Sequence, residues 1–173
     1  MARLTHDGYG QLELNNVAFR RDGRIEAQLP LKKGEFTAEK PAENGMILVV
    51  DRLEGCIRLP KSGDKLYALN YTTEHMYDDR NPGLKNFKLT PEDGFYPRLG
   101  YLAVGDKFTT NCVTLGSGVT EDKEDIEGAY GVPSADGTIL LQETAGEGLC
   151  LQAIEKTTMP DGQVAVKFIV ISC

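Results

Sequence analysis

The chain has 173 residues, of which 40% are hydrophobic and 26% charged, and its formal net charge is −7 at pH 7. A chain of this length can form one domain that buries roughly 70% of its unfolded surface. The excess of acidic residues excludes a general binder of nucleic acid, because affinity for phosphate backbones depends on Lys and Arg.

The N-terminal sequence MARLTHDGYG is polar almost from its start, so it lacks the apolar core of a secretory signal. No run of the chain reaches the roughly eighteen apolar residues that a membrane-spanning helix needs. We therefore expect a protein made in the cytoplasm of its host, with no membrane partner.

Residues 1–16 predict an extended N-terminal arm. They are polar and punctuated by Gly, and Leu12 and Leu14 alternate with Gln11 and Glu13. Such alternation is typical of a strand with one apolar face, so we expect a mobile arm that ends in an edge strand. Residues 17–173 are expected to form a single β-rich domain.

A β-hairpin is predicted over residues 17–29. Apolar residues alternate on both sides of Asp22-Gly23, and Asp-Gly between alternating segments is a strong hairpin signal because both residues tolerate positive φ. Arg20, Arg21 and Arg24 would cluster at its tip. They form either a solvated turn or an ion-pairing contact to an acidic partner.

Residues 30–44 contain two prolines and little periodicity, and predict a loop. Short apolar runs at residues 46–50, 56–59 and 65–69 then predict consecutive antiparallel strands separated by turns. Residues 71–94 are irregular and predict a long surface excursion with one helical turn over 74–77. Its Tyr71, His75 and Tyr77 form either a partner-contact surface or part of a loop packed on the domain.

The C-terminal half predicts more strands. Residues 99–104 and 107–115 flank Gly105-Asp106 as a hairpin, and residues 116–137 form an acidic excursion with a short helix capped by Thr120. Strands follow at residues 138–143, 148–155 and 163–171, and the last is apolar enough for the centre of a sheet. About nine or ten short antiparallel strands predict an all-β fold, either a small β-barrel or a β-sandwich.

The sequence offers no recognisable catalytic, cofactor or metal residues. Its four cysteines form no Cys-x-x-Cys pair, and the first three lie in apolar runs where we expect buried thiols. The only histidines, His6 and His75, accompany no nucleophile motif. The acidic residues 121–127 lack the order of a calcium loop, so we expect a protein that is not an enzyme.

Residues 43–74 read ENGMILVVDRLEGCIRLPKSGDKLYALNYTTE. Their succession of strand, turn, short strand, Gly-Asp turn and strand resembles the head-decoration, or capsid-cement, proteins of tailed bacteriophages. That resemblance implies a small, β-rich, often trimeric protein without enzymatic activity. It also implies a virion location on the outer surface of the capsid, with the major capsid protein as partner and stabilisation of the capsid as function.

For this role we expect the arm and the arginine tip to contact the shell or an adjacent subunit, with the irregular excursion as a further contact. The candidate residues are Leu4, Tyr9, Leu12, Leu14, Arg20, Arg21, Arg24, Tyr71, His75 and Tyr77. One alternative is another virion β-protein, such as a tail-tube, head-completion or baseplate component. A second is a small-ligand or carbohydrate-binding β-module, although seven Tyr and no Trp suit that class poorly.

Overall fold

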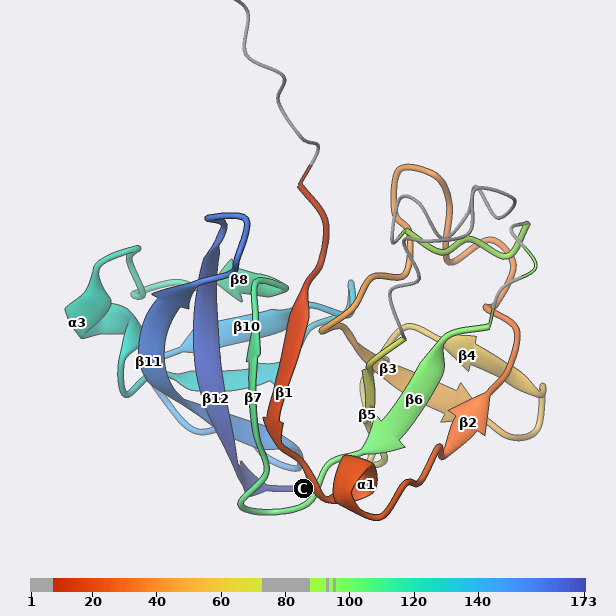
Figure 1. Ribbon diagram of the computed structural model, residues 1–173, viewed down its shortest axis with the longest axis horizontal. Helices are drawn as coiled ribbons and strands as arrows, with labels where there is room; N and C mark the ends of the chain where they lie inside the picture. Colours follow the sequence, from red (N-terminus) through yellow and green to blue (C-terminus); the bar gives the residue numbers. More distant parts are fainter. Residues whose placement is uncertain (1–7, 73–87, 93, 95) are drawn as a thin grey trace, which may run out of the picture.

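A computed structural model describes residues 8–72, 88–92, 94 and 96–173, and the regular secondary structure of these residues is almost entirely β-strand (Figure 1). Two four-residue helices occur among them, α1 (Ala18–Arg21) and α3 (Lys123–Ile126). The strands are β1 (Leu12–Asn16), β2 (Ala27–Gln28), β3 (Ile47–Asp51), β4 (Cys56–Arg58), β5 (Ala68–Asn70), β6 (Arg98–Tyr101), β7 (Lys107–Thr110), β8 (Val113–Leu115), β9 (Tyr130–Pro133), β10 (Ile139–Gln142), β11 (Cys150–Thr158) and β12 (Val164–Ser172).

The strands form two sheets. The larger has the order β1-β7-β12-β11-β9-β10-β8 and curls into a half-barrel, and the smaller has the order β2-β6-β5-β3-β4 (Figure 1). The predicted all-β class is therefore confirmed, with twelve strands in the described residues. One pairing departs from the prediction of antiparallel strands throughout, because β8 runs parallel to β10.

The C-terminal hairpin forms where the sequence predicts it. Strands β11 and β12 pair antiparallel, and the turn between them places Gly162 at φ 90°. Gly162 donates its backbone N–H to Met159, as expected for a tight turn in which Gly adopts a left-handed conformation. Strand β12 lies third in the seven-stranded sheet, which confirms its interior position.

The hairpin predicted over residues 17–29 is wrong. Residues 18–21 form α1 instead, and Gly23 ends it at φ 66°. Arg24 N–H donates to the Phe19 carbonyl at 2.8 Å, and Gly23 N–H donates to the Arg20 carbonyl at 3.1 Å. These two bonds are a Schellman motif, in which a left-handed Gly satisfies the last carbonyls of a helix. The Asp-Gly pair therefore marks a helix end here.

The hairpin predicted around Gly105-Asp106 is also wrong, because β6 belongs to the smaller sheet and β7 to the larger one. The connection crosses between the sheets, and the buried Asp106 carboxylate secures it. It accepts hydrogen bonds from the backbone N–H groups of Ala18 at 2.8 Å and Ala103 at 2.9 Å. Residues 107–115 are likewise not one strand, since β7 and β8 belong to different parts of the larger sheet.

Residues 116–137 are more structured than the predicted excursion. They contain α3 and strand β9, which lies between β11 and β10 in the sheet. Asp122 occupies the N-cap of α3 without a side-chain cap bond, so the predicted Thr120 cap is wrong. Thr120 Oγ1 instead donates to the Asp125 carboxylate at 2.6 Å.

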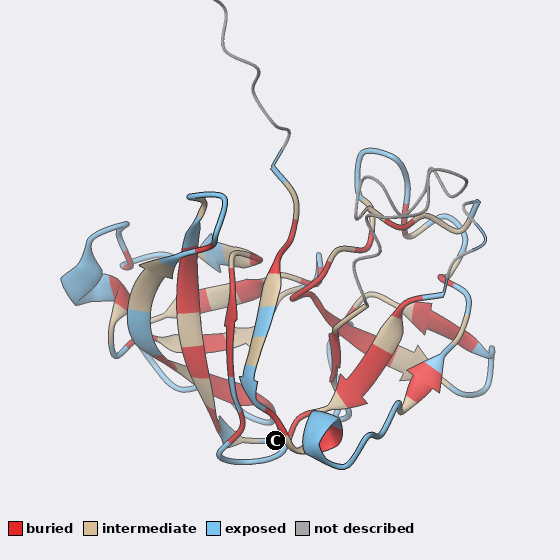
Figure 2. Cartoon of the chain, viewed as in Figure 1, coloured by how far each residue is buried: buried red, intermediate tan, exposed pale blue. Residues whose placement is uncertain are grey.

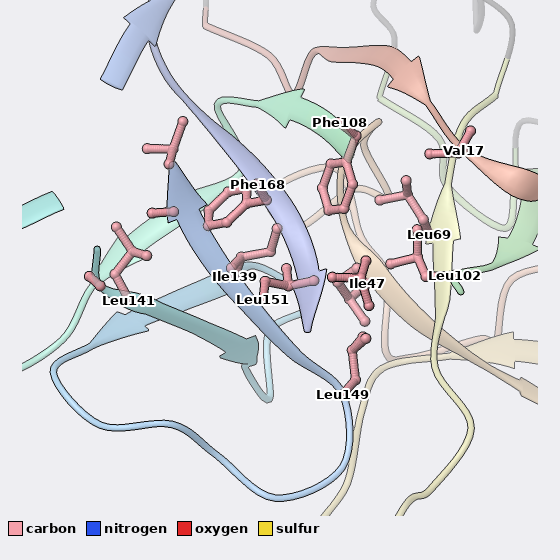
Figure 3. Close-up of a cluster of buried hydrophobic side chains, with 14 of the residues drawn as sticks. Val17, Ile47, Leu69, Leu102, Phe108, Ile139, Leu141, Leu149, Leu151 and Phe168 are labelled. Atoms are coloured by element: carbon pink, nitrogen blue, oxygen red, sulfur yellow. The ribbon is translucent and has the colours of Figure 1, made fainter. Parts of the chain in front are cut away.

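The main apolar core lies between the two sheets. Phe108 and Phe168 from the half-barrel pack near Ile47 of β3 and Leu69 of β5, and Val17 reaches the same cluster (Figure 3). The burial pattern follows the strands, with buried residues alternating along β12 (Figure 2). A second cluster covers the other face of the smaller sheet and includes Leu31, Phe36, Ala42, Leu48, Ile57 and Leu99.

The predicted burial of three thiols is confirmed. Cys56, Cys112 and Cys150 are buried, and Cys173 is exposed. Burial raises the pKa of the Cys112 thiol to about 12. Its Sγ lies 3.1 Å from the Asn44 carbonyl, so this cysteine behaves as a core residue and not as a reactive thiolate.

Candidate partner-contact site

Most of the predicted contact residues lie on one continuous segment. Tyr9 precedes β1, Leu12 and Leu14 lie on it, and Arg20, Arg21 and Arg24 lie on or directly after α1. Tyr71 follows β5 and meets this segment from the smaller sheet. Leu4, His75 and Tyr77 lie outside the described residues.

Strand β1 is an edge strand, as predicted. It ends the seven-stranded sheet and pairs only with β7 among the described strands, with a register shift between Glu13 and Asn16. Leu12 and Leu14 are half-buried and pack against the main core. These two leucines therefore hold the strand to its own sheet, and only their exposed portions are available to a partner.

A polar network fixes the chain where it enters β1. Asn111 donates from Nδ2 to the Tyr9 carbonyl at 2.8 Å and accepts from Gln11 N–H at 2.6 Å. The Gln11 side chain in turn donates to the Asp161 carboxylate on the β11–β12 turn. Residues 9–11 are therefore hydrogen-bonded to two parts of the larger sheet, the segment after β7 and the β11–β12 turn.

Glu43, in the loop before β3, also bonds to the chain that enters β1. Its carboxylate accepts a hydrogen bond from the Gly10 backbone, and burial raises the pKa of this carboxyl. Gly10 itself is in close contact, since a Cβ there would lie 2.6 Å from both Cys112 Sγ and Glu43 Cβ. The direction in which the chain enters the sheet is therefore fixed at Gly10.

The three arginines predicted at a hairpin tip, which we call the arginine tip, lie instead on or just after helix α1. Arg20, Arg21 and Arg24 are all exposed. Arg21 donates to Asn16 Oδ1 at 2.5 Å, and Arg24 lies 3.4 Å from the Glu26 carboxylate. The Arg24 side chain remains 72% exposed despite this pairing, so its guanidinium group stays accessible.

Tyr71 joins the arginine tip to the core. Its ring centroid lies 4.6 Å from that of Phe19, and its hydroxyl donates to the Arg24 carbonyl at 3.2 Å. Burial raises the pKa of its phenol. Tyr71 is therefore mainly a packing residue that holds the Arg24 backbone in place.

The β3–β4 turn carries an exposed surface that the sequence does not predict. Leu53 is fully exposed at its apex, although no pattern in the turn predicts it to be more than a loop residue. Both of its neighbours are ion-paired, Arg52 with Glu26 and Glu54 with Lys32. Since Glu26 also faces Arg24, this turn is continuous with the arginine tip.

Hydrogen bonds inside the β3–β4 turn fix its conformation. The Asp51 carboxylate accepts the backbone N–H groups of Leu53 at 3.1 Å and Glu54 at 3.0 Å. Arg58 lies behind it and makes two bonds of 2.7 Å to the Asp64 carboxylate. Such bidentate pairs fix geometry as well as charge.

The ion pair between Arg58 and Asp64 predicts that the stability of the fold depends on pH. Hydrogen bonding to Arg58 lowers the pKa of Asp64 below its ordinary value of 3.8 in the folded chain. A lowered pKa stabilises the fold above the unfolded value, and that stabilisation is lost as the pH falls through the folded value. We expect Asp64→Asn to cost about 1 kcal/mol of unfolding free energy at pH 7 and almost nothing at pH 2. Urea unfolding of both proteins at the two pH values measures this, and an equal difference at both would contradict it.

The described residues contain no group of three or more His, Cys, Asp or Glu side chains arranged to hold a metal ion. Neither helix in the described part of the chain has the length and hydropathy to cross a membrane. No protein-family model, curated protein or solved structure matches the chain.

Proposed function

We propose that this chain is a non-enzymatic structural protein of a virion, which binds the outer surface of a phage capsid and stabilises it. The resemblance of residues 43–74 to capsid-cement proteins motivates this proposal. The three strands on which it rests are present as β3, β4 and β5, with β3 pairing antiparallel to both of the others.

The observation that carries the proposal is the continuity of the segment from Tyr9 to Arg24. It places an edge strand and an arginine-bearing helix in succession along one border of the larger sheet. The polar network around Gln11 and Asn111 gives this segment a fixed starting direction. An edge strand and an N-terminal segment can both pair with a neighbouring protein through backbone hydrogen bonds.

The experiment removes the N-terminal residues without touching β1. Deletion of residues 1–16 would strip an edge strand that pairs with β7, so loss of binding could reflect loss of fold. Deletion of residues 1–8 leaves the strand and its network in place. We expect the shorter deletion to weaken binding to expanded capsids about tenfold or more, because binding energy usually concentrates in a few contacts.

Binding is measured by co-sedimentation of the purified chain with expanded capsids prepared without it. Leu4→Ser tests one candidate contact within the deleted segment, and Leu66→Ser is its matched control because Leu66 is exposed elsewhere on the surface. We expect the first substitution to weaken binding and the second to leave it unchanged. Undiminished binding of the deletion variant would overturn the proposed contact, and binding to tails instead of capsids would favour another virion role.

A further inference from the structure

The strongest unassigned surface combines the arginine tip with the apex of the β3–β4 turn. We call it the arginine patch and define it by Arg20, Arg21, Arg24, Ile25, Arg52 and Leu53. Glu26 joins its two halves, because its carboxylate pairs with Arg24 and with Arg52. With Asp22 and Glu26 included, the patch has a net charge of +2 in a chain whose net charge is −7.

The patch also exposes apolar side chains. Ile25 is 45% exposed and Leu53 wholly so. Arg is enriched and Lys depleted in protein interfaces, and the exposed Ile25 and Leu53 add apolar area that a partner could cover. The rigid turn beneath Leu53 lowers the entropy that binding would cost.

A negatively charged surface lies elsewhere on the same chain. Residues 121–127, which we call the acidic segment, have a net charge of −4, and residues 121–125 are all exposed. Beside them, Ile154 of β11 is 40% exposed. It lies between Ala153 and Lys156, whose backbones bond to the residues that follow α3.

We propose that the arginine patch of one copy binds the acidic segment of a second copy, with Leu53 packing near Ile154. Each surface offers an exposed apolar residue beside charges that the other complements. Helix α3 and the β3–β4 turn lie towards opposite ends of the long axis (Figure 1). The contact joins two different surfaces, so it propagates from copy to copy and closes into a ring or continues as a chain.

This inference rests on the proposed assembly role but is tested on the purified full-length chain alone. Its failure is therefore distinct from a failure of capsid binding. Light scattering on a sizing column gives the molar mass, and the proposal predicts a multiple of 19.0 kDa that falls towards the monomer as salt is raised. A monomer at low salt and high protein concentration would overturn it.

Charge reversal identifies the two surfaces. Arg20→Glu with Arg52→Glu changes the net charge of the patch from +2 to −2, and Glu121→Lys, Asp122→Lys and Glu124→Lys together change that of the acidic segment from −4 to +2. We expect each set to weaken self-association about tenfold or more, and all five substitutions in one chain to restore it. Dissociation by the patch reversal without restoration in the five-fold variant would overturn the proposed pairing of the two surfaces.

Two controls separate this contact from general charge and folding effects. Lys33→Glu with Lys40→Glu changes the net charge as much as the patch reversal does, at exposed positions outside the patch. We expect these substitutions to leave the molar mass unchanged. Leu53→Ser should reduce association without altering the thermal unfolding midpoint, because its side chain touches solvent only. Association that survives both the patch reversal and Leu53→Ser would overturn the proposal.

Discussion

Replacing Phe168 by alanine is expected to lower the free energy of unfolding by about 3–5 kcal/mol, the usual cost of emptying a buried Phe site. Phe168 is fully buried on the interior strand β12, and its ring centroid lies 5.8 Å from that of Phe108. The ring also packs on β9, where a Cβ at Gly131 would approach it to 3.1 Å. Its removal therefore leaves a cavity bordered by three strands.

Urea unfolding at pH 7 measures this loss. Ile171→Ala is the matched control, because Ile171 lies on the same strand with 38% of its surface exposed, and we expect it to cost less than about 1 kcal/mol. If the alanine variant does not fold, Phe168→Leu should still fold and cost about 1.5 kcal/mol. Equal losses for Phe168→Ala and Ile171→Ala would contradict the position of the core.

Replacing Gly45 by alanine is expected to cost about 3 kcal/mol or more. Gly45 adopts φ 87°, and a Cβ there would overlap Thr110 Oγ1, which is buried and donates to the Gln11 carbonyl. The substitution combines left-handed backbone strain with a steric conflict at the junction of β1, β7 and the chain entering β3.

Gly55→Ala separates these two causes. Gly55 has a similar φ of 65°, but a Cβ there would meet nothing within 4 Å. We expect it to cost only about 1 kcal/mol, which is the strain alone. Thermal and urea unfolding of both variants gives the comparison, and equal costs would show that the contact between Gly45 and Thr110 is unimportant.

Local patterns predict the elements whose partners are close in sequence. The β11–β12 hairpin follows from alternating apolar residues around Met159-Pro160-Asp161-Gly162, because register and turn are specified by neighbouring residues. The Asp22-Gly23 pair correctly predicts a left-handed residue at Gly23. It does not form the predicted hairpin, because a left-handed Gly can also end a helix.

Long-range pairings could not be predicted in this way. The parallel pairing of β8 with β10 and the crossing at Asp106 depend on residues far apart in the sequence. Strand β9 contains Gly131 and ends at Pro133, two residues that argue against a strand. Gly is needed there because a Cβ would lie 2.6 Å from Ile139 Cγ2.

Only part of the candidate site could be predicted, because local sequence patterns do not show which distant residues meet in the fold. The arginines are recognisable as a local cluster, whereas the exposure of Leu53 depends on whether any distant segment covers the turn. Its link to Arg24 through Arg52 and Glu26 is likewise visible only in the folded chain.

The most direct test of the proposed capsid role is the temperature at which filled capsids release their DNA, measured with and without saturating amounts of the chain. We expect a higher release temperature when the chain is bound, and a return to the undecorated value with the variant lacking residues 1–8. Capsids that bind the chain but release DNA at an unchanged temperature, or that do not bind it, would contradict the proposed capsid role.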